Sequence, residues 1–222
     1  MKRVAVLSSG GLDSSVLLAE LARESLVLPL YVTFGLAWEA EEQRALRAFI
    51  GELREPSIQP LTVLSLDISP FYAGHWSLTG MAVPGSETAD EAVFLPGRNI
   101  LLLGLAAVWC ATHGVGAVAL GTLGNNPFPD ASPGFFTDFA ALLGRGLGHP
   151  IDVLVPFRSL AKAELVRRAR ALPLHLTLTC LQPHDGLHCG RCNKCEERRR
   201  AFAEAGVADT TAYAGLPEPA LK

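Results

Sequence analysis

The stretch VAVLSSGGLDSSVLL, residues 4–18, decides the fold expected of this 222-residue chain. An apolar run ends at two adjacent glycines, and SSVLLAELARE then follows with the pattern of an amphipathic helix. Glycines let the backbone turn sharply and approach a ligand closely. The first amides of a helix lack partners within it and lie at the positive end of its dipole. The stretch therefore predicts a strand, an anion-binding loop and a helix.

Outward from this unit, strand-like and helix-like segments alternate along the chain. The strand-like segments are residues 3–8, 26–34, 61–67, 116–121 and 152–157, and the helix-like segments include residues 39–53, 99–113 and 160–172. Such alternation is typical of an α/β fold. We expect a doubly wound, mostly parallel five-stranded sheet, with ligand sites in the loops at the carboxyl ends of its strands.

Two segments between these elements carry little periodicity. Residues 69–98 are rich in Pro, Gly, Ser and Thr, and residues 121–134 read GTLGNNPFPDASPG. Loops of this length in compact domains are often functional. The first is expected to be a long loop or a closing lid.

Composition excludes several classes of protein. Hydrophobic residues make up 49% of the chain and charged residues 18%, which argues against disorder. The net charge of -3 gives no broad attraction to nucleic acid, and ERRRAF (residues 197–202) reads as a solvated helix face. Neither a signal peptide nor a membrane span is predicted. We expect a cytoplasmic protein without nucleic-acid or membrane partners.

The glycine loop differs from the two commonest phosphate loops. No lysine follows the glycines, and the G-x-G-x-x-G order is absent. Asp13 is a poor neighbour for a bare phosphate, but Mg²⁺ bridges carboxylate and phosphate oxygens. The loop therefore favours a magnesium-bound nucleotide such as ATP. A turn that binds nothing, with Asp13 or Ser14 as the helix N-cap, remains the alternative.

Four of the five cysteines cluster near the carboxyl end. Cys180, Cys189, Cys192 and Cys195 form a C-x8-C-x2-C-x2-C pattern, whose four thiolates suit a closed, structural zinc site. His184 or His188 in place of one cysteine, an iron-sulfur cluster, or four inert cysteines are alternatives. Cys110 stands apart in an apolar segment and is expected to be a small buried hydrophobe.

These motifs together carry a family resemblance. SGGLDS (residues 9–14) resembles the pyrophosphate loop of the ATP pyrophosphatases, also called the PP-loop. With the cysteine pattern, LPGRN (95–99), LAKAELV (160–166), CGRCNKCEERRRAF (189–202) and GVADTTAY (206–213), the chain resembles the 7-cyano-7-deazaguanine synthase family of queuosine precursor biosynthesis. The resemblance implies an adenine nucleotide alpha hydrolase-like fold.

The resemblance also implies an ATP-dependent carbon-nitrogen ligase reaction. In the family, ATP adenylates the carboxylate of 7-carboxy-7-deazaguanine, ammonia displaces AMP to give an amide, and a second ATP drives dehydration to the nitrile, preQ0. Mg²⁺ and Zn²⁺ accompany the reaction, and members often form homodimers. By the same resemblance, residues 1–175 would form the PP-loop domain and residues 176–222 a small zinc-stapled helical extension packed on it.

The resemblance assigns roles to individual residues. Asp13, Ser14, Arg98 and Lys162 are the expected catalytic residues. The expected nucleotide contacts are Leu7, Ser8, Ser9, Gly10, Gly11, Leu12, Asp13, Ser14, Ser15, Val16, Leu17 and Asn99. Alternatively, Arg98 only begins a helix and Lys162 is a solvated helix lysine.

The chain departs from the family in the loops expected to contact the base. Leu36, Ala37 and Trp38 replace a polar trio, although Phe34, Gly35 and Glu41 persist. Ala131 and Ser132 replace Cys and Arg, after a retained Phe128, Pro129 and Asp130. The acceptor is therefore open: a different carboxylate, a tRNA base, or no acceptor in a nucleotide-binding homologue are alternatives.

Overall fold

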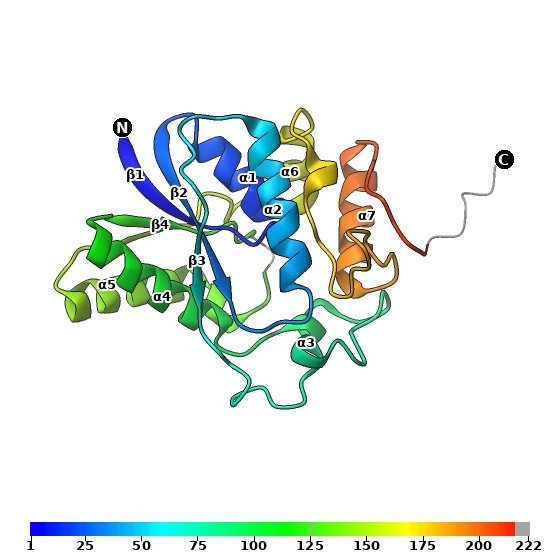
Figure 1. Ribbon diagram of the computed structural model, residues 1–222, viewed down its shortest axis with the longest axis horizontal. Helices are drawn as coiled ribbons and strands as arrows, with labels where there is room; N and C mark the ends of the chain where they lie inside the picture. Colours follow the sequence, from blue (N-terminus) through cyan, green and yellow to red (C-terminus); the bar gives the residue numbers. More distant parts are fainter. Residues whose placement is uncertain (125, 216–222) are drawn as a thin grey trace.

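The computed structural model describes residues 1–124 and 126–215 (Figure 1). Within them, β1 (Lys2–Leu7), β2 (Ser25–Thr33), β3 (Thr62–Ser65), β4 (Ala117–Ala119) and β5 (Asp152–Leu154) form one sheet. All pairings are parallel, in the order β3-β2-β1-β4-β5. The predicted five-stranded α/β fold is confirmed. Asn125 of the predicted loop 121–134, and residues 216–222 of the predicted extension, lie outside the described residues.

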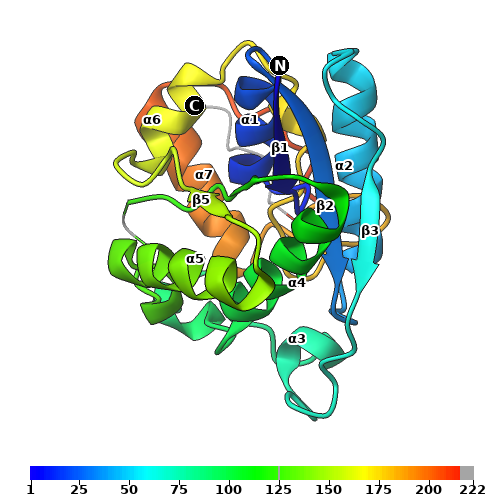
Figure 2. The same cartoon turned by 90° about the vertical axis from the view of Figure 1, so that its left-hand side faces the viewer.

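Helices cover both faces of the sheet (Figures 1 and 2). The bounds of the helices are α1 (Leu12–Leu21), α2 (Glu39–Leu53), α3 (Trp76–Thr79), α4 (Arg98–His113), α5 (Pro133–Leu147), α6 (Lys162–Arg168) and α7 (Asn193–Ala205). Figure 2 shows α4 and α5 on one face, while α1, α2, α6 and α7 lie on the other. Each face has its own apolar core, and Leu30 and Val118 belong to one while Val27 and Ala119 belong to the other. No helix in the described ranges has both the length and the apolarity to cross a membrane.

The helix after the glycine loop is more buried than its sequence predicts. The prediction of an amphipathic helix is wrong, because seven of the ten residues of α1 are buried, including Ser14 and Ser15. The sheet covers one side of α1, and α2 and α6 contact it as well. Helix α1 is therefore a central element that fixes the glycine loop from behind.

Residues 69–98 carry more structure than the expected loop. They contain α3 and a 3₁₀ helix, Asp90–Val93, and they are tied to the cysteine segment. The Ser86 amide donates to the Arg191 carbonyl at 3.0 Å, and the Asn193 amide donates to the Pro84 carbonyl at 2.9 Å. This pairing joins the middle of the long segment to the start of α7.

Two glycines allow the close approach of neighbouring elements to the loop. Gly10 has φ +77°, and a Cβ built on it would lie 2.5 Å from the Glu42 carbonyl oxygen of α2. A Cβ on Gly121, just after β4, would lie 2.9 Å from the Asp13 carbonyl carbon. Real Cβ atoms do not approach so closely, so both positions require glycine.

Candidate functional site

A cavity of about 330 Å³ opens at the carboxyl edge of the sheet. The strand order reverses between β1 and β4, where the segments following both strands line it. Ligands bind at this position in open α/β sheets, and the size suits a small molecule. The predicted residues that line the cavity are Leu7, Ser8, Ser9, Gly11, Leu12, Asp13, Ser14, Arg98, Asn99 and Lys162.

Four predicted nucleotide contacts do not line this cavity: Gly10, Ser15, Val16 and Leu17. Gly10 faces the backbone of α2, and the other three side chains are fully buried within α1. The structure places these residues behind the loop. We therefore expect them to shape it rather than touch a ligand.

The hydroxyls of the loop are linked to one another. Ser14 Oγ accepts from the Ser9 amide at 3.1 Å and lies 3.1 Å from Ser9 Oγ. The Gly11 amide donates to Ser9 Oγ at 3.2 Å. These bonds hold the loop open toward the cavity, where the first amides of α1 are available to an anion.

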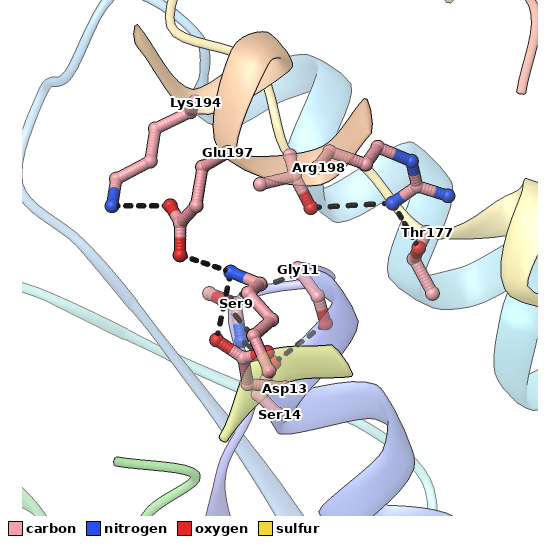
Figure 3. Close-up of polar contacts among 10 residues, drawn as sticks. Ser9, Gly11, Asp13, Ser14, Thr177, Lys194, Glu197 and Arg198 are labelled. Atoms are coloured by element: carbon pink, nitrogen blue, oxygen red, sulfur yellow. Dashed lines mark hydrogen bonds and ion pairs between the residues drawn. The ribbon is translucent and has the colours of Figure 1, made fainter. Parts of the chain in front are cut away.

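A chain of alternating charges crosses the loop end of the cavity (Figure 3). Lys162 Nζ lies 3.2 Å from Asp13 Oδ2 and 2.7 Å from Glu197 Oε1, and Lys194 Nζ lies 2.7 Å from Glu197 Oε2. All four residues line the cavity. The Lys162 side chain is only 10% exposed, so it is not a solvated helix lysine. The other oxygen, Asp13 Oδ1, is buried and has no partner among the described residues.

Burial and charge oppose each other in this chain. Burial raises the pKa of Asp13, and the positive charge of Lys162 only partly offsets this. Burial alone would lower the pKa of Lys162, but Asp13 and Glu197 raise it above its ordinary value. Burial would raise the pKa of Glu197, yet the two lysines lower it to about 2. Lys162 is therefore charged at neutral pH.

Glu197 and Lys194 are missing from the residues predicted by sequence. Both belong to α7, and ERRRAF reads as a solvated helix face because its charges are dense. That prediction is wrong for Arg198, which has 0% relative exposure. Only the i, i+3 spacing of Lys194 and Glu197 signals a pair, and it says nothing about the cavity.

Another part of the cavity wall is built from α2, β2 and α4. Trp38, Tyr31 and Glu42 line it, and Tyr31 donates its hydroxyl to Glu42 Oε2 at 2.8 Å. Burial raises the pKa of Glu42 to about 7, against the opposing effect of the positive charge of Arg98. The Arg98 Nε is buried without a partner in the described part of the chain. This part of the wall therefore offers an aromatic ring, an acceptor and a donor that no described residue binds.

Asp130 belongs to a loop expected to contact the base, but its side chain binds the start of α4 instead. It is buried, and its Oδ2 accepts from the Asn99 amide at 3.0 Å. The Asn99 side-chain amide donates to the Asp130 carbonyl at 3.0 Å. Asp130 thus satisfies a free amide in the first turn of α4 and orients Asn99 at the cavity wall.

The residues that depart from the family pattern are mostly structural. Leu36 and Ala131 are buried in the core, and Ser132 accepts from the Phe135 amide as the N-cap of α5. Trp38 is the exception, because it lines the cavity and stacks on Trp76 with ring centroids 5.7 Å apart. Although Trp38 is buried, it is therefore the substituted residue that can change the cavity wall.

The four cysteines of the predicted metal site come together. The sulfur atoms of Cys180, Cys189, Cys192 and Cys195 all lie within 4.8 Å of one another, and all four residues are buried. Neighbouring thiols lower the pKa of Cys189 but raise the pKa of Cys180, and the Cys189 amide donates to Cys180 Sγ at 3.2 Å. Four sulfurs gathered this closely fit a tetrahedral metal ion.

Neither histidine alternative is supported. His188 Nε2 accepts from the Thr179 amide at 2.9 Å, and burial lowers the pKa of His188 to about 3. This nitrogen is occupied within the protein. His184 is exposed, and it is not part of the sulfur cluster.

Helix α7 connects the cysteine cluster to the glycine loop. Arg198 donates to Thr177 Oγ1 at 2.9 Å (Figure 3), and it also donates to the Leu174 carbonyl at 2.8 Å. The segment that it holds supplies the Leu178 amide, which donates to the Gly10 carbonyl at 2.8 Å. The cysteine cluster and the loop thus share one continuous hydrogen-bonded segment.

Comparison with known proteins gives the family. The sequence profile described as "Queuosine biosynthesis protein QueC" matches residues 3–206. The chain belongs to the QueC family. The resemblance inferred from the motifs is confirmed, and the match includes both the glycine loop and all four clustered cysteines of this QueC family member.

Named relatives of this QueC family member cover nearly all of it. A 7-cyano-7-deazaguanine synthase of Anaeromyxobacter dehalogenans is 34% identical, over 96% of each chain. A protein of the same name from Methanoculleus marisnigri is 33% identical, over 96% of this chain and 99% of the relative. Among solved structures, a predicted tRNA methyltransferase subunit from Methanocaldococcus jannaschii matches with TM-score 0.50 and 18% identity, over 76% of this chain and 74% of that one. At that identity the likeness concerns the fold alone.

Proposed function

We propose that the protein is an ATP-dependent ligase that converts 7-carboxy-7-deazaguanine and ammonia to 7-cyano-7-deazaguanine in queuosine precursor biosynthesis. The carrying observation is the cavity between a glycine-serine loop, whose Asp13 has an oxygen that no described residue binds, and an aromatic, hydrogen-bonding wall. Membership of the QueC family and the names of the relatives support the substrate.

The loop end suits the phosphates of ATP. The first amides of α1 and the Ser9 and Ser14 hydroxyls would bind the departing pyrophosphate. Lys162 has a third N–H available to a phosphate oxygen, since an ammonium has three donors. Mg²⁺ held by Asp13 would offset phosphate charge. These residues therefore stabilise the leaving group rather than attack the substrate.

The reaction proposed in this cavity is activation of the acceptor carboxylate followed by amination. A carboxylate oxygen of the acceptor attacks the α-phosphorus, and pyrophosphate leaves. Ammonia then attacks the carboxyl carbon, loses a proton, and expels AMP to give an amide, which a second ATP converts to the nitrile. Arg98, whose Nε has no partner among the described residues, would hold the acceptor carboxylate or the α-phosphate.

Trp38 and Glu42 form the surface for the heterocycle. Trp38 is held by Trp76 and is only 3% exposed, so it would fix the shape of the wall against which the heterocycle lies. Glu42 accepts from Tyr31 and interacts with the Trp38 side chain, and it would also accept from an exocyclic amine. This surface favours a planar ligand with N–H donors.

The second candidate is a PP-loop ligase for a different carboxylate-bearing acceptor. The apolar Trp38, where the family has a polar residue, favours it because this residue faces the cavity. A tRNA base is less favoured, since the chain has a net charge of -3. A homologue that binds ATP without catalysis is the remaining alternative.

The test is a reaction with ATP, Mg²⁺, ammonium and 7-carboxy-7-deazaguanine, analysed by mass spectrometry. AMP, pyrophosphate and the nitrile are expected, and Asp13→Asn is expected to abolish them. AMP formed only with another carboxylate would favour the second candidate. ATP binding without AMP formation on any acceptor would favour the non-catalytic alternative.

Three further parts of the proposal concern composition and assembly. Zinc is the proposed metal, residues 1–175 and 176–222 are the proposed domain and extension, and the protein is proposed to be a cytoplasmic homodimer. Elemental analysis should give one zinc per chain, and a brown, iron-containing protein would contradict it. Light scattering would measure the oligomeric state.

A further inference from the structure

We infer that Glu197 is a positioning residue of the phosphate end: it holds Lys162 away from full pairing with Asp13, which leaves Asp13 available to Mg²⁺. The inference rests on the proposed use of magnesium-ATP. It assigns a role in the nucleotide site to a residue of α7, the helix that carries Cys195 of the cysteine cluster.

The geometry gives Glu197 the stronger hold on Lys162. The Lys162 Nζ lies 2.7 Å from Glu197 but 3.2 Å from Asp13. Two of the three ammonium donors are thereby used, and the third is left for a phosphate oxygen. Asp13 keeps its Oδ1 without a partner among the described residues, as a metal ligand requires.

Glu197 is itself held in place from the other side. Lys194 Nζ lies 2.7 Å from the second oxygen of Glu197, and both residues belong to the first turns of α7. The Glu197 side chain is 18% exposed, so water competes weakly with these contacts. The orientation of Glu197 is thus fixed within α7, whose N-cap is Cys192 of the cysteine cluster.

Removal of the Glu197 charge has a specific expected effect. Lys162 would then have Asp13 as its anionic partner within this chain of charges, and the ammonium would compete with Mg²⁺ for the same carboxylate. A merely structural ion pair would change stability without changing the Mg²⁺ requirement. The Mg²⁺ dependence of ATP binding therefore separates the two roles.

The experiment measures ATP binding to the full-length, metal-loaded protein by calorimetry, without acceptor, over a series of Mg²⁺ concentrations. For Glu197→Gln, the Mg²⁺ concentration at half-maximal binding should rise about tenfold, as expected for a disturbed, partly buried charge pair. The control is Glu196→Gln, because Glu196 is the neighbouring residue on α7 and pairs with Arg199 instead. Zinc content and melting temperature should match the wild type in this control.

A double variant tests the inference even if Glu197→Gln alone is less stable than the wild type. In Glu197→Gln with Lys162→Met, the competing cation is gone, so the Mg²⁺ requirement should return toward the wild-type value even though ATP binds more weakly. Additive effects of the two changes would overturn the inference. So would equal behaviour of Glu197→Gln and Glu196→Gln.

The outcome also separates this inference from the proposed function. Mg²⁺-dependent ATP binding that is the same in the wild type and in Glu197→Gln would overturn the role of Glu197 alone. Absence of Mg²⁺-dependent ATP binding by the wild type would overturn both. A shifted Mg²⁺ requirement without nitrile formation would leave the role of Glu197 supported and the proposed substrate wrong.

Discussion

At the scale of single residues, Glu42 shows how burial changes chemistry within the cavity. Its pKa is raised to about 7 because the carboxylate is removed from water, and Arg98 and Tyr31 only partly compensate. Sequence could not predict this, since Glu39, Glu41 and Glu42 are adjacent acids on one helix. Only packing against β2 decides which of them faces the cavity.

Glu42 predicts a pH-dependent loss of stability. Its pKa is higher in the folded protein, about 7, than the ordinary 4.5, so the folded state binds the proton more tightly. Stability is therefore lost as pH rises from about 4.5 to 7, by up to about 3 kcal/mol at 1.36 kcal/mol per pH unit. Glu42→Gln should become progressively more stable than the wild type over this range in urea unfolding. The same pH profile for Glu42→Gln and the wild type would contradict it, and Glu52→Gln, at an exposed acid of the same helix, is the control.

Gly121 gives a second prediction at this scale. A Cβ there would lie 2.9 Å from the backbone of Asp13, so Gly121→Ala must push β4 away from the loop. We expect a loss of about 2 kcal/mol in unfolding free energy and weaker ATP binding. Gly51→Ala is the matched control, because no atom lies within 4 Å of its Cβ and α2 should gain about 0.5–1 kcal/mol. Equal effects of both changes would contradict the close approach.

At the scale of elements, the pattern of apolar residues along the sequence predicts all five strands but not every helix. All five strands coincide with predicted apolar runs, although only β1, β2 and β4 are mostly buried and the outer strands β3 and β5 are partly exposed. The sequence pattern does not predict α5, because Pro133 and Gly134 end a segment that is expected to be a loop. Pro nevertheless suits the first turn of a helix. The tie between residues 84–86 and α7 has no sequence signal, because it uses backbone atoms.

Helix α4 depends on a cap from a distant segment. Asp130 accepts from the Asn99 amide, and α4 begins at Arg98. Asp130→Ala should lower the unfolding free energy by about 1–2 kcal/mol, as for other lost caps. It should also weaken ligand binding, since it frees Asn99. Asp138→Ala, an exposed acid on α5, is the control, and equal melting temperatures of the two variants would refute the cap.

At the scale of the whole molecule, sequence predicted the fold, the loop and the cysteine cluster but not how the cluster and the loop are joined. Four close cysteines carry a strong spacing signal, whereas buried Arg198 reads as one charge among several. The joining contacts run from Arg198 through Thr177 to the Leu178 amide on Gly10. Such contacts between residues far apart in sequence follow only from the assembled fold.

Because the segment 174–178 joins α7 to Gly10, loss of the metal should change the glycine loop. Cys189→Ser should release the metal, lower the melting temperature and weaken ATP binding, because the segment that holds Gly10 loses its anchor. Cys110→Ala should keep the metal, since Cys110 is buried in the core apart from the cluster. Metal analysis, thermal denaturation and calorimetry measure these effects. A metal-free Cys189→Ser protein that binds ATP as the wild type does would refute the coupling.

The central claim, adenylation of an acceptor carboxylate, is tested most directly by isotope transfer. The wild-type protein would be given 7-carboxy-7-deazaguanine labelled with ¹⁸O in its carboxylate, with ATP, Mg²⁺ and ammonium. The carboxylate oxygen that attacks the α-phosphorus remains on phosphorus when ammonia displaces AMP. Mass spectrometry should therefore find one ¹⁸O in each AMP formed during amide synthesis, whereas amide formation with unlabelled AMP, or with ADP and labelled phosphate, would contradict the mechanism.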